Sequence, residues 1–171
     1  MKQPKKPSAV AHAVEQTPVH YASAPVARRV SSPITDALFA RLVKHAPGSG
    51  NEAILAIRSG YPASILKSAG YYFGIPDARI QRITAVPATT AQRLEKNAAN
   101  IDPAASERIH RMGIVTRIAI EVFDNKQTAL SWMCRSNPAL ADSAPLDLLD
   151  TEPGAIAVRQ ILNAIATGGV V

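Results

Sequence analysis

The sequence has one cysteine in 171 residues, and aromatic residues make up only 5% of it. With no second cysteine the chain forms no internal disulfide, and a reducing compartment fits best. Cys134 lies in an apolar run beside Trp132 and Met133, and no histidine or basic residue is clearly placed to activate its thiol. We therefore interpret Cys134 as a small buried hydrophobic residue rather than a reactive group.

The patterns typical of enzymes and cofactor-binding proteins are also absent. The chain has no glycine-rich phosphate loop, and its histidines lack the spacing of metal ligands or of a Ser-His-Asp arrangement. Three carboxylates lie close together within residues 147–152, but on short helices such groups are more often exposed caps than an acid-base pair. The sequence predicts a protein that is not an enzyme and that binds no metal or cofactor.

Long hydrophobic runs are missing as well. No segment approaches the roughly 18 apolar residues of a membrane span, and the opening MKQPKKPSAVAHAV has no unbroken apolar core of a secretory signal. We expect an intracellular protein without a membrane partner. Residues 1–31 carry five basic residues and one acid, and their Pro, Ala and Ser content favours a disordered basic tail over an organelle transit peptide.

The most prominent features of the composition are the high alanine content and the uneven distribution of charge. Alanine, the best helix former, supplies much of the 47% hydrophobic content, and strand-like alternation is hard to find, so we expect an all-α fold. The net charge is +4 over residues 1–52, +5 over residues 53–120 and −3 over residues 121–171. Such a division indicates two surfaces for two kinds of partner, the first a polyanion, although an ordinary solvated surface explains the charge equally well.

Proline and glycine mark where the expected helices begin and end. Ser32-Pro33 opens the first helix, and Asp102-Pro103 opens a long one whose apolar arc is wider than one stripe. We interpret the long helix as a central core helix, with contact to another subunit as the alternative. The expected helical segments are residues 33–44, 51–58, 63–73, two helices within 77–97, 103–123, a helix holding 129–133, 145–150 and 152–167.

The stretch DARIQRITAVPATTAQRLEKN, residues 77–97, has the order of helix-forming and turn residues that is typical of a helix-turn-helix. Ile80 and Ile83 are expected to face inward on the first helix, and a turn at residues 85–87 leads to the second. On the second helix, Thr and Lys side chains can reach phosphates, whereas Gln and Arg can bind base edges. A purely structural helix pair remains the alternative. The candidate DNA-binding residues are Thr89, Thr90, Gln92, Arg93 and Lys96.

The stretch NPALADSAPLDLLDTEPG, residues 137–154, is acidic and contains closely spaced proline and glycine residues. Pro145 is expected to open a short helix and Thr151 to cap the last helix, which Gly168-Gly169 ends. The apolar residues on both sides of this cap are expected to share a core. They are Leu146, Leu149, Val158, Ile161, Leu162 and Ile165.

From about Tyr61 to its end, the chain resembles the Xre/ParS/MbcA antitoxins of bacterial RES-type toxin-antitoxin modules. EVFDNKQTALSWM, residues 121–133, is similar to the family pattern EVFGD...ALxWL. Residues 137–168 are similar in order and spacing to NPALGGxTPLDLLxTxxGxxxVxxLLxxIxxG, and the upstream ASERIHRMGIV looks like SxRLxRL. The chain departs from the family at Ala141 and Asp142, where two glycines are usual, and at Ala144, where threonine is usual. The turn of the helix-turn-helix likewise has Ala85 where glycine is usual.

This resemblance implies a bacterial cytoplasmic antitoxin with two activities. The C-terminal domain would bind and block a RES-domain toxin, an enzyme that consumes NAD or uses it to modify a target. The helix-turn-helix would bind operator DNA and repress the module's own operon, as a homodimer within a toxin-antitoxin hetero-oligomer. The expected segments are a tail at 1–31, an Xre-like helix-turn-helix domain at 32–100 and a toxin-binding domain at 101–171.

Acidic residues are expected to help the chain meet its toxin, because a pocket that binds the phosphates of NAD is expected to be basic. Two alternatives stay open: a stand-alone dimeric DNA-binding regulator without a toxin, and a helical enzyme with a transit peptide. The candidate toxin-binding residues are Asp147, Asp150, Arg159, Asn163, Val170 and Val171.

Overall fold

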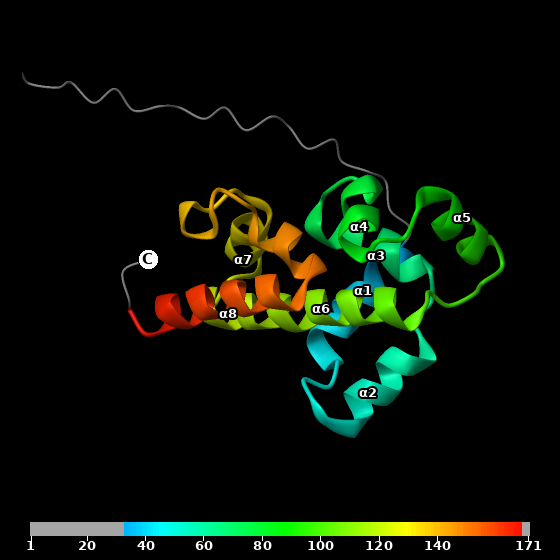
Figure 1. Cartoon of the computed structure of the whole chain (residues 1–171), viewed down its shortest axis with the longest axis horizontal. Coiled ribbons are helices and arrows are strands. Elements are labelled where there is room, and N and C mark those ends of the chain that lie inside the picture. Colours follow the sequence, from blue (N-terminus) through cyan, green and yellow to red (C-terminus); the bar gives the residue numbers. More distant parts are fainter. Residues whose placement is uncertain (1–32, 169–171) are drawn as a thin grey trace, which may run out of the picture.

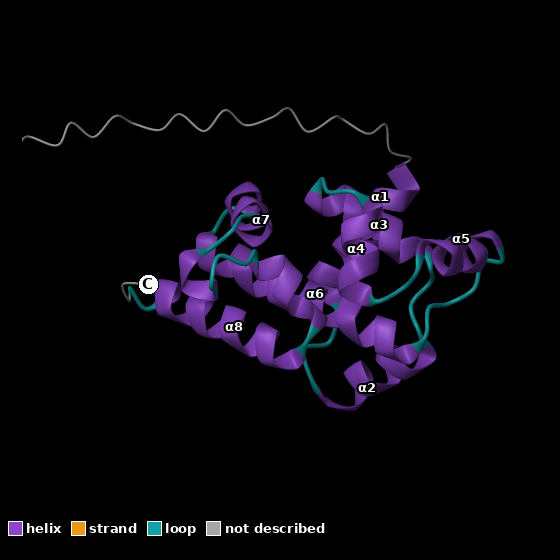
Figure 2. Cartoon of the chain, turned by 45° about the horizontal axis from the view of Figure 1, so that its top comes forward, coloured by secondary structure: helices purple, strands orange, loops and turns teal. Residues whose placement is uncertain are grey.

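The structure is a computed structural model that describes residues 33–168, with side chains described from residue 37. Within that range it consists of α-helices, two short 3-10 helices and loops, and it contains no strand, which confirms the all-α expectation (Figure 2). The predicted basic tail and the terminal valines Val170 and Val171 lie outside the described residues. The helices are α1 (Pro33–His45), α2 (Gly50–Ser59), α3 (Ser64–Phe73), α4 (Asp77–Thr84), α5 (Ala88–Lys96), α6 (Pro103–Phe123), α7 (Lys126–Cys134), η1 (Pro138–Leu140), η2 (Pro145–Asp150) and α8 (Glu152–Ala166).

Helix α6 is the element around which the others pack. The Asp102 carboxylate caps it by accepting hydrogen bonds from the N–H groups of Ala104 and Ala105, at 2.9 and 3.0 Å. Helices α1, α2, α4, α7 and α8 and the 3-10 helix η2 all contact it, and α8 runs alongside it (Figure 1). Since Ile109 and Met112 are fully buried, α6 is a central core helix, as the width of its apolar arc predicts.

One continuous core joins the N-terminal and C-terminal helices. Phe39 of α1 is fully buried, and its ring lies 5.3 and 5.4 Å from those of Tyr72 and Phe73 in α3. Of the six apolar residues expected to share the C-terminal core, all are buried except Ile165, which packs against the buried residues from a partly exposed position. No helix in the described part of the chain is long and apolar enough to cross a membrane.

The proline, glycine and capping residues predict most helix boundaries correctly. Thr151 caps α8 as expected, since its hydroxyl oxygen accepts a hydrogen bond from the N–H of Gly154 at 3.2 Å. The boundaries differ by about one residue, with α1 reaching His45 and α2 beginning at Gly50. The short segment opened by Pro145 is a 3-10 helix rather than an α-helix.

Candidate nucleic-acid interface and partner surface

Helices α4 and α5 form the expected helix-turn-helix. Ile80 and Ile83 of α4 and Val86 in the turn are buried, so they anchor the pair to the core. Ala85 ends α4 in the left-handed conformation, with φ at 56°, and the N–H of Val86 donates to the carbonyl of Gln81 at 3.0 Å. This turn directs the chain away from the core into α5.

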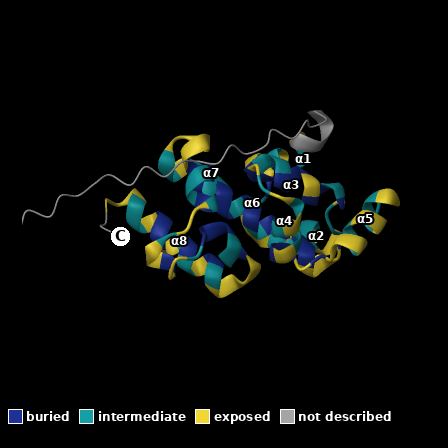
Figure 3. Ribbon diagram, turned by 90° about the horizontal axis from the view of Figure 1, so that it is seen from above, coloured by how far each residue is buried: buried dark blue, intermediate teal, exposed yellow. Residues whose placement is uncertain are grey.

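Helix α5 presents a polar surface to solvent. None of its residues is buried, and it lies at one end of the molecule, away from α7 and α8 (Figure 3). Ala91 and Leu94 pack against the core from partly buried positions. The candidate DNA-binding residues are thus brought together on the outer side of one helix, where Thr89, Gln92, Arg93 and Lys96 are exposed and Thr90 is half-buried.

An ion pair holds α5 against α3. Lys67 Nζ lies 2.7 Å from one carboxylate oxygen of Glu95 and 2.9 Å from the other. The hydrogen bond to Glu95 raises the pKa of the Lys67 ammonium. Arg93 and Lys96 make no ion pair with any described residue, so their charges are available to a phosphate backbone.

Asp147 of η2 contacts the helix-turn-helix rather than pointing freely into solvent. Its carboxylate lies 2.8 Å from Arg79 Nε and 3.0 Å from Arg82 Nη2, both on α4. A second bond of 3.0 Å, from Arg79 Nη2 to the other carboxylate oxygen, makes the Arg79 pair bidentate. Burial acts to raise the pKa of the Asp147 carboxyl, but the hydrogen bonds and charges of the two arginines outweigh it and hold that pKa below its usual range.

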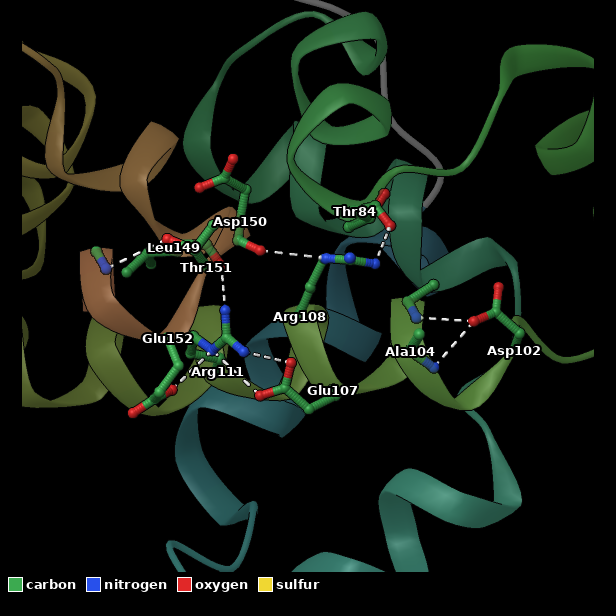
Figure 4. Close-up of polar contacts among 12 residues, drawn as sticks. Thr84, Asp102, Ala104, Glu107, Arg108, Arg111, Leu149, Asp150, Thr151 and Glu152 are labelled. Carbon is green, nitrogen blue, oxygen red and sulfur yellow. Dashed lines mark hydrogen bonds and ion pairs between the residues drawn. The ribbon is translucent and has the colours of Figure 1, made fainter. Parts of the chain in front are cut away.

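Two arginines of α6 donate to backbone carbonyls of the neighbouring elements α4 and η2 (Figure 4). Arg108 donates to the carbonyl of Thr84, the last residue of α4, at 3.3 Å and to that of Asp150, the last residue of η2, at 3.2 Å. The side chain of Arg111 is only 9% exposed, and it donates to the carbonyl of Leu149 at 3.0 Å. These contacts fix η2 to α6 and α4.

The same region contains a cluster of alternating charges. Arg111 pairs with Glu107 one turn earlier in α6, and its Nε lies 3.2 Å from a carboxylate oxygen of Glu152. Arg159 Nη2 lies 2.5 Å from the other oxygen of Glu152. Among the acidic residues in 137–154, Glu152 is therefore neutralised by this cluster and Asp147 by the α4 arginines. Asp142 and Asp150 are exposed, and neither carboxylate forms an ion pair with a described residue.

One face of α8 combines polar residues with an exposed apolar one. Ile156, Arg159 and Asn163 follow one another at helical spacing, so they share a face. Ile156 is 44% exposed and is the large apolar side chain that α8 presents to solvent. Among the candidate toxin-binding residues the structure thus brings together Arg159 and Asn163, while Asp147 and Asp150 lie on η2.

Sequence reasoning did not identify the arginines that connect the elements, namely Arg79, Arg82, Arg108 and Arg111. The available signal was their spacing, because each pair is three residues apart on a helix and so projects from one face. Ile156 was also missed, although it lies outside the apolar stripe of α8.

No group of three or more His, Cys, Asp or Glu residues within residues 37–168 is arranged to hold a metal ion. Cys134 is partly buried, and burial raises the pKa of its thiol, which favours the unreactive protonated form.

Comparison with known proteins identifies both halves of the chain. Residues 52–112 match the family model described as the antitoxin Xre-like helix-turn-helix domain, which spans α2 to the first half of α6. Residues 119–168 match the model described as the antitoxin Xre/MbcA/ParS C-terminal toxin-binding domain. A curated relative, "Antitoxin Xre" from Yersinia enterocolitica, is 29% identical over 120 residues, which are 70% of this chain and 81% of that protein. The chain therefore belongs to the Xre/MbcA/ParS-like antitoxins, with a DNA-binding helix-turn-helix domain followed by a toxin-binding domain.

Proposed function

We propose that the chain neutralises a RES-domain toxin that consumes NAD, and that it represses transcription of its own operon. The observation that carries this proposal is the order of the two matched domains, a helix-turn-helix domain followed by a toxin-binding domain. RES-type specificity is supported by the resemblance of residues 121–133 and 137–168 to the antitoxins of such modules.

Operator recognition is assigned to α5. Its exposed residues combine side chains that can bind phosphates with side chains that can bind base edges, namely Thr89, Thr90, Gln92, Arg93 and Lys96. We expect the operator-bound form to be a homodimer, since two copies of one recognition helix read two half-sites.

Toxin binding is assigned to η2, the exposed face of α8 and the C-terminal residues. Ile156 supplies an apolar centre. Arg159 and Asn163 lie beside it on α8, and Asp150 lies on the adjoining η2. An apolar centre with a polar rim is typical of protein interfaces. Asp147, Val170 and Val171 complete the proposed toxin-facing set. The exposed carboxylates of Asp142 and Asp150 are the groups that would attract a basic toxin pocket, so toxin affinity is expected to fall as salt concentration rises.

Co-expression with the product of the neighbouring gene tests this function. The wild-type chain is expected to restore growth, preserve cellular NAD and co-purify with the toxin. Ile156→Asp is expected to weaken all three, whereas Gln127→Glu, at an exposed position of α7 outside the assigned surface, serves as the control. Absence of both complex and rescue with the wild-type chain would favour the stand-alone dimeric regulator.

A further inference from the structure

Three contacts tie α4 to the C-terminal part of the chain. Asp147 binds Arg79 and Arg82 through both of its carboxylate oxygens. Arg79 also donates to the carbonyl of Cys134, at the end of α7, over 3.3 Å. Arg108 of α6 joins the last carbonyls of α4 and η2. All three contacts involve at least one charged group, and the bidentate pairing of Asp147 with Arg79 adds geometric specificity.

The orientation of α5 depends on that of α4. Only residues 85–87 separate the two helices, and α5 itself has no buried residue. The direction of α5 is otherwise fixed by the partly buried Ala91 and Leu94, by the ion pair between Glu95 and Lys67, and by the backbone bonds of residues 99–101 to residues 61–63. A small rotation of α4 therefore moves the proposed DNA-facing side chains, because they extend from a short, exposed helix.

We propose that Asp147 is a positioning residue for DNA recognition: from the toxin-binding domain, it fixes Arg79 and Arg82 of α4 and through them the orientation of α5. This inference rests on the proposed operator binding through α5. It assigns to the acidic stretch a role inside the molecule, in addition to attraction of a partner.

A link between the two partners follows from this arrangement. The Asp147 carboxylate already accepts three hydrogen bonds from arginines and is 31% exposed, so a toxin cation that binds it competes with α4. Toxin binding at Asp147 then changes the affinity for operator DNA, and operator DNA changes the affinity for toxin by the same factor.

The ratio of operator affinity to random-DNA affinity tests the proposal without toxin. The operator probe is the DNA upstream of the chain's own coding sequence, and the random probe has the same length and base composition. Asp147→Asn removes one negative charge and frees two arginines, so affinity for random DNA is expected to rise while the misplaced α5 loses operator contacts. We expect the ratio to fall by about fivefold or more, the lower end of typical coupling between sites.

Asp150→Asn is the matched control, because it removes the same charge from the same 3-10 helix at an exposed carboxylate without an ion pair to a described residue. It should change both affinities alike and leave their ratio unaltered. In an Arg79→Gln background, Asp147→Asn should lower the ratio much less, since its main partner is already gone. Arg82→Gln, at a side chain 69% exposed, offers a variant that should not disturb folding and should also lower the ratio.

The possible outcomes are distinct. If the wild-type chain does not prefer the operator probe, the proposed operator binding fails. If it does, but Asp147→Asn lowers the ratio no more than Asp150→Asn in chains with the wild-type circular dichroism spectrum, Asp147 does not position α5 and the inference is overturned.

Discussion

Several residues other than glycine adopt the left-handed conformation that favours glycine. Ala85, Asp124, Ala141 and Asp142 have φ values of 56°, 46°, 50° and 58°. At Asp124, Ala141 and Asp142 the family pattern has glycine, and glycine is also usual at the helix-turn-helix turn that Ala85 occupies. The departures from glycine therefore coincide with places where a side chain strains the backbone, whereas Ala144, where threonine is usual, has an ordinary φ of −76°.

Ala85→Gly is expected to stabilise the chain. Removing the Cβ relieves the left-handed strain at this exposed turn, and the greater freedom of glycine in the unfolded state offsets part of the gain, leaving up to about 1 kcal/mol. Urea denaturation measures the difference. The same change at Ala88, in the first turn of α5, should stabilise nothing, and equal effects at both positions would contradict the argument.

The surroundings of His110 favour its neutral form. Its Nε2 lies 2.9 Å from the carbonyl of Pro47, which can only accept, so Nε2 carries the proton and Nδ1 accepts from the Tyr61 hydroxyl at 2.7 Å. Burial lowers the pKa of His110, an effect that the bond to Pro47 and the charge of Glu107 oppose in part and that Arg117 assists.

Acidification is expected to weaken the fold through His110. Because the folded pKa lies below the ordinary value of about 6.5, the unfolded chain takes up the proton more readily, and stability present above that value is lost as the pH falls below it. Melting temperatures between pH 7.5 and 5.5 should reveal the decline. His110→Gln, which keeps one donor and one acceptor, should show a shallower decline, and an unchanged slope would assign the effect to other groups.

At the scale of elements, Gly154 permits η2 and α8 to meet. A Cβ at this position would lie 2.0 Å from the carbonyl oxygen of Leu148, a backbone atom that cannot rotate away. Gly154→Ala is therefore expected to destabilise the chain by about 3 kcal/mol, near the upper end for overpacking. Gly113→Ala should cost less in the same denaturation experiment, since its Cβ meets side-chain atoms of Leu42 at 2.9 and 3.0 Å rather than a backbone atom at 2.0 Å. Equal losses would contradict this interpretation.

A separate prediction concerns the binding of operator DNA by helix α5. Arg93→Ala together with Lys96→Ala is expected to weaken operator binding and to reduce the slope of log affinity against log salt by about 1 for each phosphate that the variant no longer neutralises. Titrations at several salt concentrations measure both quantities, and toxin neutralisation should not change. Lys44→Ala on α1 is the control for general loss of charge, and intact operator binding in the double variant would mean that α5 is not the recognition helix.

The helices could be predicted from local signals, whereas the side-chain contacts between them could not. Asp102-Pro103, Asn125 and Thr151 act within a few residues, so their capping roles follow from sequence. The pairing of Asp147 with Arg79 spans 68 positions and depends on how η2 packs on α4, which no local pattern encodes. For that reason the sequence marked Asp147 as a partner-facing residue and missed its contacts inside the chain.

At the scale of the whole molecule, α2 exposes an apolar surface. Ile54 and Leu55 are 45% and 60% exposed, and α2 projects from the side of α6 (Figure 2). We assign the proposed homodimer contact to this surface, so Leu55→Glu is expected to shift the chain toward monomer in sedimentation equilibrium. Gln160→Glu adds the same charge to α8 and should leave the mass unchanged. A dimer that survives Leu55→Glu would place the contact elsewhere.

The single core has a consequence for how long the protein's activities last. Helix α6 carries the end of one family match, at residue 112, and the beginning of the other, at residue 119. Opening α6 exposes buried residues of both halves, so the two halves are expected to lose their core together. A protease that captures the opened chain would therefore remove the proposed repression and neutralisation in one event, and the two would decay with a common half-life.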